Sequence, residues 1–417
     1  MEFKWKEKKV SEIGNIVTGK TPSTKREKNF GGRVPFLTPS DDMNARYVYE
    51  TKRHLSDEGV NEVRKKLIPK NSICISCIGS QLGKVTITTE ETVTNQQINS
   101  IIINDEYNIK FIYYLFLILG QKLNFLSKSS TAVPIINKKF FSEIVVKVPQ
   151  RQLQDKTAIL LDSLDSKIEI NNKIISNLES QAQAIFKSWF VDFEPFQDGD
   201  FVESELGMIP KGWEVKELGE LYPMKSGYAF KSKDWSDNGF PIIKIKNISN
   251  GSIDLSNVDY VNCKETLKKA ISFKVTGGEI VMALTGATTG KFGVIPYNTS
   301  AYINQRAGLF FDKQEIGYGF LYGLLKQKKI INNIIELSQG SAQENLSPRD
   351  VNSLKIAFYK NITDIFNLLN YYIKKVSELK FQNTKLAELR DALLPKLMAG
   401  EIDVSNIKIE GKEVKNE

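Results

Sequence analysis

The stretch Asn71-Ser-Ile-Cys-Ile-Ser-Cys-Ile-Gly-Ser-Gln-Leu-Gly-Lys84 decides the fold, because the chain contains a second version of it. The counterpart, Gly278-Glu-Ile-Val-Met-Ala-Leu-Thr-Gly-Ala-Thr-Thr-Gly-Lys291, keeps the apolar run, both glycines and the final lysine. Smaller matches keep the same order at an offset of about 208 residues. They are Ile13-Gly14 with Leu218-Gly219, Thr18-Gly19 with Ser226-Gly227, Val34–Leu37 with Phe240–Ile243, Asn95-Gln96 with Asn304-Gln305, and Phe111–Leu117 with Phe320–Lys326. A repeat of this length predicts two related domains.

Each half of the chain is expected to be a mixed domain of short strands with few long helices. Short apolar runs separated by Gly, Pro and Asn are typical of strands, whereas a longer apolar run is typical of a helix. Strands are predicted at residues 73–78, 84–88 and 98–103, and a helix at 110–124. We therefore predict an α+β fold with two similar mixed α/β domains in tandem, at 1–150 and 213–360, with a linker at 196–212.

Each domain is followed by a helical stretch with an apolar stripe, at 151–195 and at 361–403, and a polar tail follows at 404–417. The first stripe comprises Leu161, Leu164, Ile168, Asn171, Ile175, Leu178, Ala182, Ile185 and Trp189. The second comprises Leu369, Tyr372, Val376, Leu379, Asn383, Leu386, Arg390, Leu393 and Leu397. Alternating spacings of three and four predict a coiled-coil seam, in which one asparagine on each stripe sets the register.

The path of the chain indicates how the two helices pair. Since the second helix can return the chain towards the first domain, we expect an antiparallel coiled coil with a pseudo-twofold axis. A parallel pair stays open, because a fully stretched connector at 195–212 can span one helix length of roughly 50 Å. Two helices that pack separately on their own domains are the other alternative.

The net charge of +8 is unevenly distributed along the 417 residues. Residues 1–150 carry a net charge of +8, residues 151–204 carry −5, residues 205–360 carry +5, and residues 361–417 are neutral. Two basic modules on neutral or acidic connectors favour binding to a polyanion. An ordinary lysine-rich surface is the competing interpretation.

The chain has the composition of an intracellular protein without a cysteine framework. It begins with no secretion-signal pattern, and its most apolar stretch, 111–119, is about half the length that crosses a bilayer, so we expect it in the cytoplasm. Cys74 and Cys77 form a C-x-x-C pair, but they lie in an apolar run and align with Val281 and Leu284. We predict buried strand cysteines rather than metal ligands.

Residues 14–21, Gly-Asn-Ile-Val-Thr-Gly-Lys-Thr, match the P-loop pattern of nucleotide-binding proteins. A P-loop needs a buried strand before it and a helix whose N-terminus holds phosphate after it. The preceding residues are strongly charged, and the following ones lack an apolar stripe. The second domain has Ser226-Gly227-Tyr228 at this place, without the lysine. A basic loop at the edge of a DNA-binding face is therefore the favoured interpretation, and nucleotide binding is the rival.

Polar and basic residues near the repeated glycines are the candidates for DNA contact. The pattern G-x-x-x-G-K at 79–84 and 286–291 suits a backbone that approaches phosphate beside a lysine, although it also suits a plain turn between strands. Asn and Gln beside a strand suit bidentate contacts with base edges, although they also hold turns. The candidates are Lys20, Thr21, Lys25, Arg26, Arg33, Gln81, Lys84, Asn95, Gln96, Gln97, Lys225, Thr288, Thr289, Lys291, Asn304, Gln305, Arg306 and Gln343.

No catalytic constellation accompanies these candidates. His54 is the single histidine, so a histidine-based metal site or a conventional triad is excluded, and we expect no metal. Amino-methyltransferase motifs, helicase motifs and a nuclease-like cluster of acids and lysine are also absent from the sequence. The sequence therefore predicts a protein that binds DNA without acting on it.

Several segments resemble the specificity (S) subunits of type I restriction-modification systems, and the resemblance covers nearly the whole chain. The residues that carry it are 183–195 (QAIFKSWFVDFEP), 206–213 (LGMIPKGW), 340–347 (GSAQENLS), 351–356 (VNSLKI) and 393–402 (LLPKLMAGEI). The first and last resemble the family's central and closing regions. Residues 146–150 depart from the pattern, since they lack a run of prolines often present there.

The resemblance implies that each domain is a target-recognition domain that reads one half of a split, asymmetric DNA site. The helices would set the gap between the halves and dock two modification subunits. The resemblance also implies that this chain holds no cofactor, since S-adenosylmethionine, ATP and Mg²⁺ belong to the modification and restriction subunits. A P-loop protein built on 14–21 and a coiled-coil scaffold without a DNA role are the alternatives.

Overall fold

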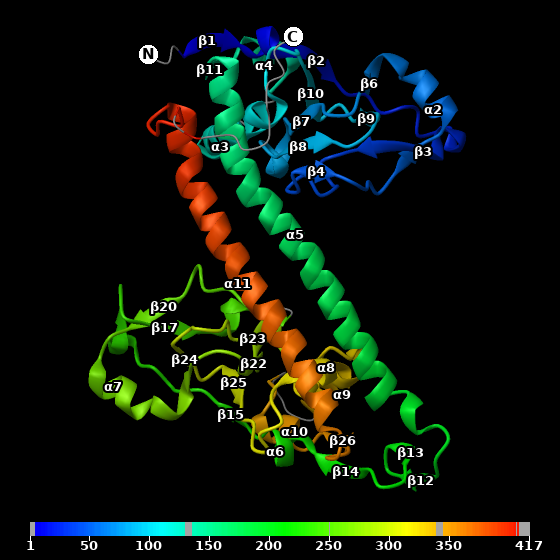
Figure 1. Cartoon of the computed structure of the whole chain (residues 1–417), viewed down its shortest axis with the longest axis vertical. Helices are drawn as coiled ribbons and strands as arrows, with labels where there is room; N and C mark the ends of the chain where they lie inside the picture. The colour runs from blue at the N-terminus through cyan, green and yellow to red at the C-terminus, as the bar shows by residue number, and fades with distance from the viewer. Residues whose placement is uncertain (1–4, 130–135, 250, 339–344, 406, 408–417) are drawn as a thin grey trace. The chain divides into compact units, whose positions relative to one another are not determined.

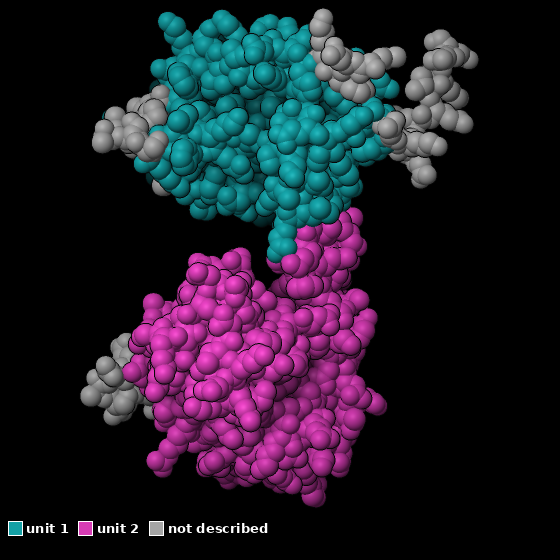
Figure 2. All heavy atoms as spheres, turned by 90° about the vertical axis from the view of Figure 1, so that its left-hand side faces the viewer, with its two compact units in different colours: residues 1–166, 387–417 teal, residues 167–386 magenta. Residues whose placement is uncertain are grey.

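The computed structural model describes residues 5–129, 136–249, 251–338, 345–405 and 407. The chain divides into two compact units, Met1–Ser166 with Ala387–Glu417, and Lys167–Leu386, which Figure 2 colours separately. Each unit therefore contains one copy of the repeat and part of each long helix.

The first unit is built on a five-stranded and a four-stranded sheet (Figure 1). The five-stranded sheet has the order β2 (Gly14–Thr18), β10 (Ile98–Ile103), β7 (Ile73–Ser76), β8 (Val85–Thr88) and β4 (Tyr47–Val48). The four-stranded sheet has the order β5 (His54–Leu55), β3 (Phe30–Leu37), β9 (Thr92–Thr94) and β6 (Leu67–Ile68). A further pair joins β1 (Lys6–Lys9) to β11 (Val145–Val148). The three predicted strands at 73–103 are confirmed as β7, β8 and β10.

The second unit repeats this arrangement. Its larger sheet has the order β15 (Met224–Ser226), β25 (Ala307–Phe310), β22 (Ile280–Ala283), β23 (Phe292–Val294), β19 (Gly251–Ile253) and β18 (Ile248–Ser249). The smaller has the order β16 (Trp235–Ser236), β20 (Asp259–Val261), β17 (Phe240–Ile243), β24 (Ala301–Ile303) and β21 (Lys274–Val275). The pair β14 (Glu214–Glu217) with β26 (Lys355–Phe358) matches β1 with β11.

Parallel pairs in mainly antiparallel sheets show that the two copies share a topology. In the first unit β3 runs parallel to β9 and β4 runs parallel to β8. In the second unit the equivalent pairs, β17 with β24 and β19 with β23, are parallel as well. Because parallel neighbours need a crossover connection, the same two crossovers recur in both domains. The tandem α+β fold is confirmed.

The short helices of the first domain are α1 (Val10–Ile13), α2 (Asp57–Glu62) and α4 (Lys138–Glu143). Those of the second are α6 (Leu218–Leu221), α7 (Lys264–Lys269), α8 (Gly319–Leu325), α9 (Lys328–Ser338) and α10 (Pro348–Asn352). The long helices α5 (Arg151–Phe190) and α11 (Thr363–Ala399) complete the fold.

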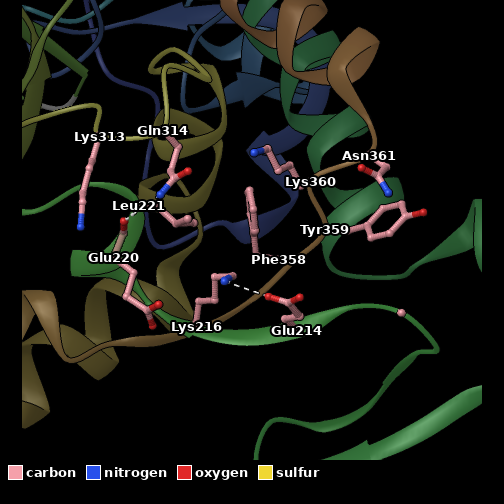
Figure 3. Close-up of a pocket in the computed structure, with 11 residues that line it drawn as sticks. Glu214, Lys216, Glu220, Leu221, Lys313, Gln314, Phe358, Tyr359, Lys360 and Asn361 are labelled. Atoms are coloured by element: carbon pink, nitrogen blue, oxygen red, sulfur yellow. Dashed lines mark hydrogen bonds and ion pairs between the residues drawn. The ribbon is translucent and has the colours of Figure 1, made fainter.

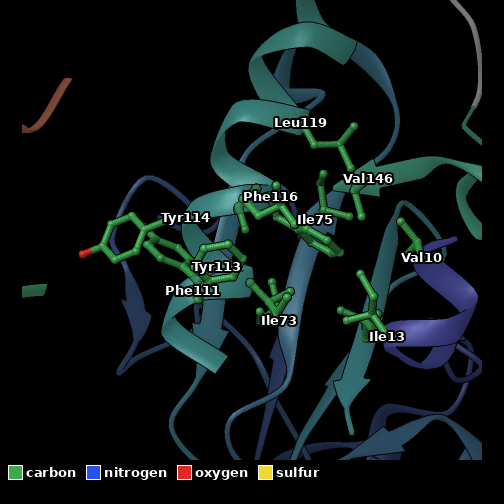
Figure 4. Packing of buried hydrophobic residues seen from close by; sticks show 14 of the residues in the cluster. Val10, Ile13, Ile73, Ile75, Phe111, Tyr113, Tyr114, Phe116, Leu119 and Val146 are labelled. Carbon is green, nitrogen blue, oxygen red and sulfur yellow. The ribbon is translucent and has the colours of Figure 1, made fainter. Parts of the chain in front are cut away.

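The first core lies between the larger sheet and α3 (Ile109–Ser129), which contains the helix predicted at 110–124. Phe111 and Phe116 of α3 are fully buried against the sheet residues Ile73 and Ile75 (Figure 4). By length and composition α3 is also apolar enough to cross a membrane. Its first half, from Phe111 to Phe116, is buried in this core, which accounts for the apolar residues there, while Phe125 and Leu126 are exposed.

The two cysteines of the C-x-x-C pair are confirmed as buried free thiols. Cys74 lies in β7 and packs with Leu37, Met43 and Ile98. Burial raises the pKa of the Cys74 thiol to about 12 and that of the Cys77 thiol to about 11. Both thiols are therefore protonated and unreactive at neutral pH.

The two apolar stripes pair in antiparallel order. In the second unit the Asn171 Nδ2 group donates to Asn383 Oδ1 over 2.8 Å, and Asn383 Nδ2 donates to Asn172 Oδ1 over 2.8 Å. Further along α5, the hydroxyl of Tyr372 donates to Gln181 Oε1, so residue numbers rise on one helix as they fall on the other. In the first unit Leu161 and Leu397 are buried in one cluster. The antiparallel alternative is confirmed, and the two asparagines do meet.

The ends of the helices do more than pair with each other. Phe186 and Phe190 lie outside the predicted stripe, yet both are buried against Phe320 and Phe366 in the core of the second domain. Helix pairing and packing on the domains, which the sequence presented as alternatives, therefore occur together.

The stretch expected to be a linker, 196–212, is folded. It contains a hairpin of β12 (Phe201–Ser204) and β13 (Gly207–Pro210), closed by Gly207 at a φ of 95°. Phe193 and Phe196 flank it and pack edge-on against Trp213. The periodicity of so short a hairpin is too brief to distinguish it from a loop, so sequence patterns missed it.

Replacing both seam asparagines with leucine (Asn171→Leu with Asn383→Leu) should raise the free energy of unfolding by about 1–2 kcal/mol. The reason is that Asn171 is fully buried and its Oδ1 atom has no hydrogen-bond partner in the described part of the chain. Urea unfolding followed by circular dichroism measures the change. Asn171→Leu alone is the matched control and should gain less, because it leaves Asn383 Oδ1 without its donor. A double variant less stable than the wild type would contradict this account.

Candidate nucleic-acid interface

Three loops of the first domain meet at one end of its sheets. The backbone N–H of Lys20 donates to the carbonyl of Thr94 over 2.9 Å, and the hydroxyl of Thr21 donates to Gln96 Oε1 over 2.8 Å. The N–H of Cys77 donates to the carbonyl of Gln97 over 2.8 Å. The loops at 19–21, 94–97 and 77–84 thus form one surface, which we call the first loop cluster.

The second domain forms an equivalent second loop cluster from 227–229, 304–307 and 284–291. The N–H of Gly227 donates to the carbonyl of Ala307 over 2.9 Å, and the N–H of Gln305 donates to the carbonyl of Tyr228 over 3.0 Å. The N–H of Leu284 donates to the carbonyl of Arg306 over 3.0 Å, which matches the bond from Cys77 to Gln97. Backbone bonds of this kind do not depend on the side chains, so the cluster persists where the residues differ.

The two asparagine candidates form turns. Asn95 and Asn304 are each 8% exposed, and each places Oδ1 against the N–H two residues ahead. Those donors are Gln97 at 3.1 Å and Arg306 at 3.4 Å. This is the side-chain turn that asparagine commonly makes. For Asn95 and Asn304 the geometry favours the turn interpretation over direct base contact.

The residues that follow these asparagines face solvent. Gln96, Gln305 and Arg306 are exposed, and Gln97 is half-buried. Their amide and guanidinium groups have the donors and acceptors that base edges require. The buried asparagine therefore holds the turn on which the exposed pair is presented.

The glycines of the G-x-x-x-G-K motif are explained by backbone conformation. Gly79 and Gly83 have φ values of 74° and 88°, and Gly286 and Gly290 have φ values of 76° and 78°. Each motif forms a 3-10 turn, at Gly79–Gln81 or Gly286–Thr288, and closes between two strands. Lys84 is half-buried and Lys291 is exposed at the end of its turn, while Gln81, Thr288 and Thr289 are half-buried. The turn presents a lysine beside each loop cluster.

The remaining candidates are more scattered. Lys20, Lys25, Arg26, Arg33 and Lys225 are all exposed. Lys20 belongs to the first loop cluster, whereas Arg26 lies 3.8 Å from the carboxylate of Glu62. Lys25 precedes Arg26, Arg33 lies on β3, and Lys225 lies on β15. In the part of the chain that the structure describes, none of these outlying side chains makes a hydrogen bond or an ion pair with a loop cluster.

Gln343 lies outside the described residues. Beyond the undescribed residues, the N–H of Leu346 donates to the carbonyl of Leu284 over 2.9 Å. In the first domain the N–H of Ile136 donates to the carbonyl of Cys77 in the same way.

The P-loop interpretation of 14–21 fails on geometry. Gly14–Thr18 is strand β2, which pairs with β10, and Gly14 has an extended φ of −177°. The next helical element is the 3-10 turn Glu27–Asn29. A helix N-terminus that could hold phosphate is therefore missing after the motif.

Two cation–aromatic pairs lie at the smaller sheets, and neither was predicted from the sequence. The guanidinium of Arg53 lies 4.0 Å from the ring centre of Phe30, and the Lys244 ammonium lies 3.5 Å from that of Trp235. The sequence pattern that could have indicated these pairs is a set of basic residues interleaved with aromatic ones. The partners are separated in sequence and lie outside the repeated blocks, so pattern matching did not join them.

A pocket of about 440 Å³ in the second unit is not part of either cluster (Figure 3). It is lined by both signs of charge, including the ion pair between Lys216 and Glu214 at 2.8 Å. None of the candidate DNA-contacting residues lines it.

Comparisons with known proteins agree with the duplication. A family model described as the type I restriction modification DNA specificity domain matches residues 2–180 and 210–358. The type I restriction enzyme MjaIX specificity subunit of Methanocaldococcus jannaschii is 29% identical over 421 residues, which covers 97% of this chain and 94% of the relative. The HindI specificity subunit of Haemophilus influenzae is 38% identical over 154 residues, 36% of this chain and 33% of the relative.

A solved structure has a similar fold. The crystal structure of the type I restriction-modification system S subunit from M. genitalium gives a TM-score of 0.64 at 16% identity. The match covers 95% of this chain and 96% of that one.

Gly83→Ala should destabilise the first domain more than Gly79→Ala. Both positions have positive φ, so each alanine costs about 1–2 kcal/mol in backbone strain. A Cβ at Gly83 would also lie 2.1 Å from the carbonyl oxygen of Gly120, which adds about 1–3 kcal/mol, whereas a Cβ at Gly79 meets nothing within 4 Å. Differential scanning calorimetry compares the two melting temperatures. Equal losses would show that the close approach of the two backbones does not constrain this turn.

Proposed function

The chain belongs to the type I restriction-modification DNA specificity family, and on that premise we propose that its two loop clusters each read one half of a bipartite DNA site. It is the specificity subunit of a type I restriction-modification system. The observation that carries the proposal is the recurrence of the loop cluster, with the same backbone bonds, in two domains of net positive charge.

The chemistry of the two clusters suits different DNA sequences. The first presents Gln96 and Gln97, and the second presents Gln305 and Arg306 at the same places. Glutamine suits adenine, whereas arginine suits guanine, as bidentate partners in the major groove. Two equivalent scaffolds with different side chains would read two different half-sites, which makes the full site asymmetric.

Charged groups beside the clusters are proposed to hold the phosphates. Lys84 and Lys291 stand at the ends of equivalent turns. Lys20 precedes Thr21, whose hydroxyl donates a hydrogen bond to Gln96. Phosphate contacts position a protein on the duplex, while base contacts specify the sequence.

The long helices are proposed to set the gap between the half-sites and to dock two modification subunits, with restriction subunits completing the assembly. In this scheme S-adenosylmethionine, ATP and Mg²⁺ are bound by those partners in the cytoplasm, and this chain is not catalytic by itself. Support comes from α5 and α11, which run for 40 and 37 residues and pair through polar seam residues.

DNA affinity should fall steeply with salt, because each neutralised phosphate releases counterions. Lys84→Gln and Lys291→Gln should each reduce the slope of log K against log[salt] by about 1. Fluorescence anisotropy with duplex DNA measures the slope. Lys173→Gln, an exposed lysine on α5, is the control and should leave the slope unchanged. Salt-independent binding by the wild type would refute the proposal.

Lengthening the helices should change the spacing of the recognised half-sites. Inserting one heptad after Asn171 and another after Asn383 adds about 10.5 Å to each helix. This length corresponds to roughly three base pairs of DNA. Methylome sequencing of a host that carries the variant and its modification subunit reads the spacing directly. An unchanged gap between the half-sites would rule out the helices as the ruler.

A further inference from the structure

One carboxylate in the first unit joins three separate elements. Asp165 of α5 accepts a hydrogen bond from the hydroxyl of Tyr114 on α3 over 2.6 Å. Its other oxygen accepts from Nη1 of Arg390 on α11 over 2.7 Å. The recognition domain and both helices therefore meet at a single side chain.

This joint is nearly closed to solvent. The side chain of Asp165 is 9% exposed and that of Arg46, its neighbour from the recognition domain, is 6% exposed. Arg46 pairs with Asp162 of α5 at 2.5 Å, and its Nη2 donates to the hydroxyl of Ser166 over 3.2 Å. Burial and the nearby carboxylate raise the pKa of Tyr114, so its hydroxyl stays protonated and donates.

The second unit has a joint of the same chemistry. Glu179 of α5 accepts from the hydroxyl of Tyr322 on α8 over 3.3 Å and pairs with Lys380 of α11 at 2.8 Å. Again a carboxylate on α5 receives a tyrosine from the recognition domain and a cation from α11. Burial lowers the pKa of the neighbouring Lys326, and the carboxylate of Glu179 opposes that shift.

The two joints do not correspond under the internal repeat. At an offset of 208 Asp165 aligns with Ile373 and Glu179 with Ala387, whereas Tyr114 aligns with Tyr322, or with Gly323 in the match of Phe111 with Phe320. Both carboxylates belong to α5 and share one heptad position, since they lie two heptads apart in the sequence. The carboxylates and the cations of the two joints are therefore non-equivalent residues, which indicates a requirement of the arrangement rather than a relic of the duplication.

We propose that Asp165 and Glu179 are positioning residues, which set the angle of each recognition domain on its helices through Tyr114 and Tyr322. The inference rests on the proposed function, because the angle matters where two loop clusters must meet two half-sites. The Asp165 side chain is 9% exposed, whereas those of Glu179 and Lys380 are 24% and 32% exposed. Removing one partner of a buried charge leaves an uncompensated group, so the arrangement that keeps all the partners together is favoured, most strongly at Asp165.

Tyr114→Phe is the sharpest variant. It removes only the hydroxyl that ties the recognition domain to Asp165, and it leaves the pairing of Asp165 with Arg390 in place. Asp165→Asn removes the negative charge but keeps the Tyr114 hydroxyl. Asp165→Glu keeps a carboxylate at this position. Lys167→Gln is the control, because Lys167 is an exposed residue of the same helix, two residues from Asp165.

Pulsed electron paramagnetic resonance on the full chain tests the joint without DNA. Spin labels at Lys70→Cys and Ser163→Cys, both exposed and in the first unit, report the placement of the domain on α5 in a Cys263→Ser background. We expect one narrow distance distribution for the parent, Lys167→Gln and Asp165→Glu. Tyr114→Phe and Asp165→Asn should broaden or shift it. Unchanged distance distributions for both variants would overturn the inference. Partial unfolding lowers the amount of folded protein but does not broaden the distance distribution of the molecules that remain folded.

DNA binding then separates this inference from the proposed function. The probe is a duplex with the half-sites at the natural gap, compared with duplexes one base pair longer and shorter. Tyr114→Phe should reduce the preference for the natural gap by about tenfold relative to the parent. An unreduced preference overturns the positioning role, whereas a parent chain that binds none of the duplexes overturns the proposed function and leaves the resonance result standing.

Discussion

Each recognition domain closes its hydrophobic core with side chains from both long helices, and the rest of the structure depends on this constraint. In the first unit Leu153 and Leu161 of α5 join Leu397 of α11 in the cluster that contains Phe111. In the second unit Phe186 of α5 and Phe366 of α11 join the cluster that contains Phe320. A domain that borrows its core from two helices cannot move away from them without exposing apolar surface.

The same constraint explains why polar groups are tolerated at the helix surface. Asn171, Asp165 and Arg46 are buried, and such groups cost free energy unless they are paired. Asp165, Arg46 and the amide N–H of Asn171 find partners on the opposite helix or across the contact between domain and helix, while Asn171 Oδ1 has none in the described residues. Apolar contacts thus supply the attraction, and the buried polar contacts select the geometry.

In the loop clusters too, the backbone and the side chains have separate roles. Backbone hydrogen bonds and glycines with positive φ build the same turn twice, while the side chains carried on it differ, as in Gln97 against Arg306 and Lys20 against Tyr228. A scaffold maintained by the backbone leaves its surface residues free to vary. Two readers of different sequences can therefore share one fold.

Local pattern alone determined the duplication, the strands β7, β8 and β10, the apolar stripes and the burial of Cys74 and Cys77, because each depends on residues close together in the chain. Only the tertiary structure decided that Asn95 and Asn304 hold turns, that residues 196–212 form a hairpin, and that Asp165 meets Tyr114 and Arg390. These features join groups distant in sequence or too short to show a period, and side-chain burial and hydrogen-bond geometry exist only once the chain has packed.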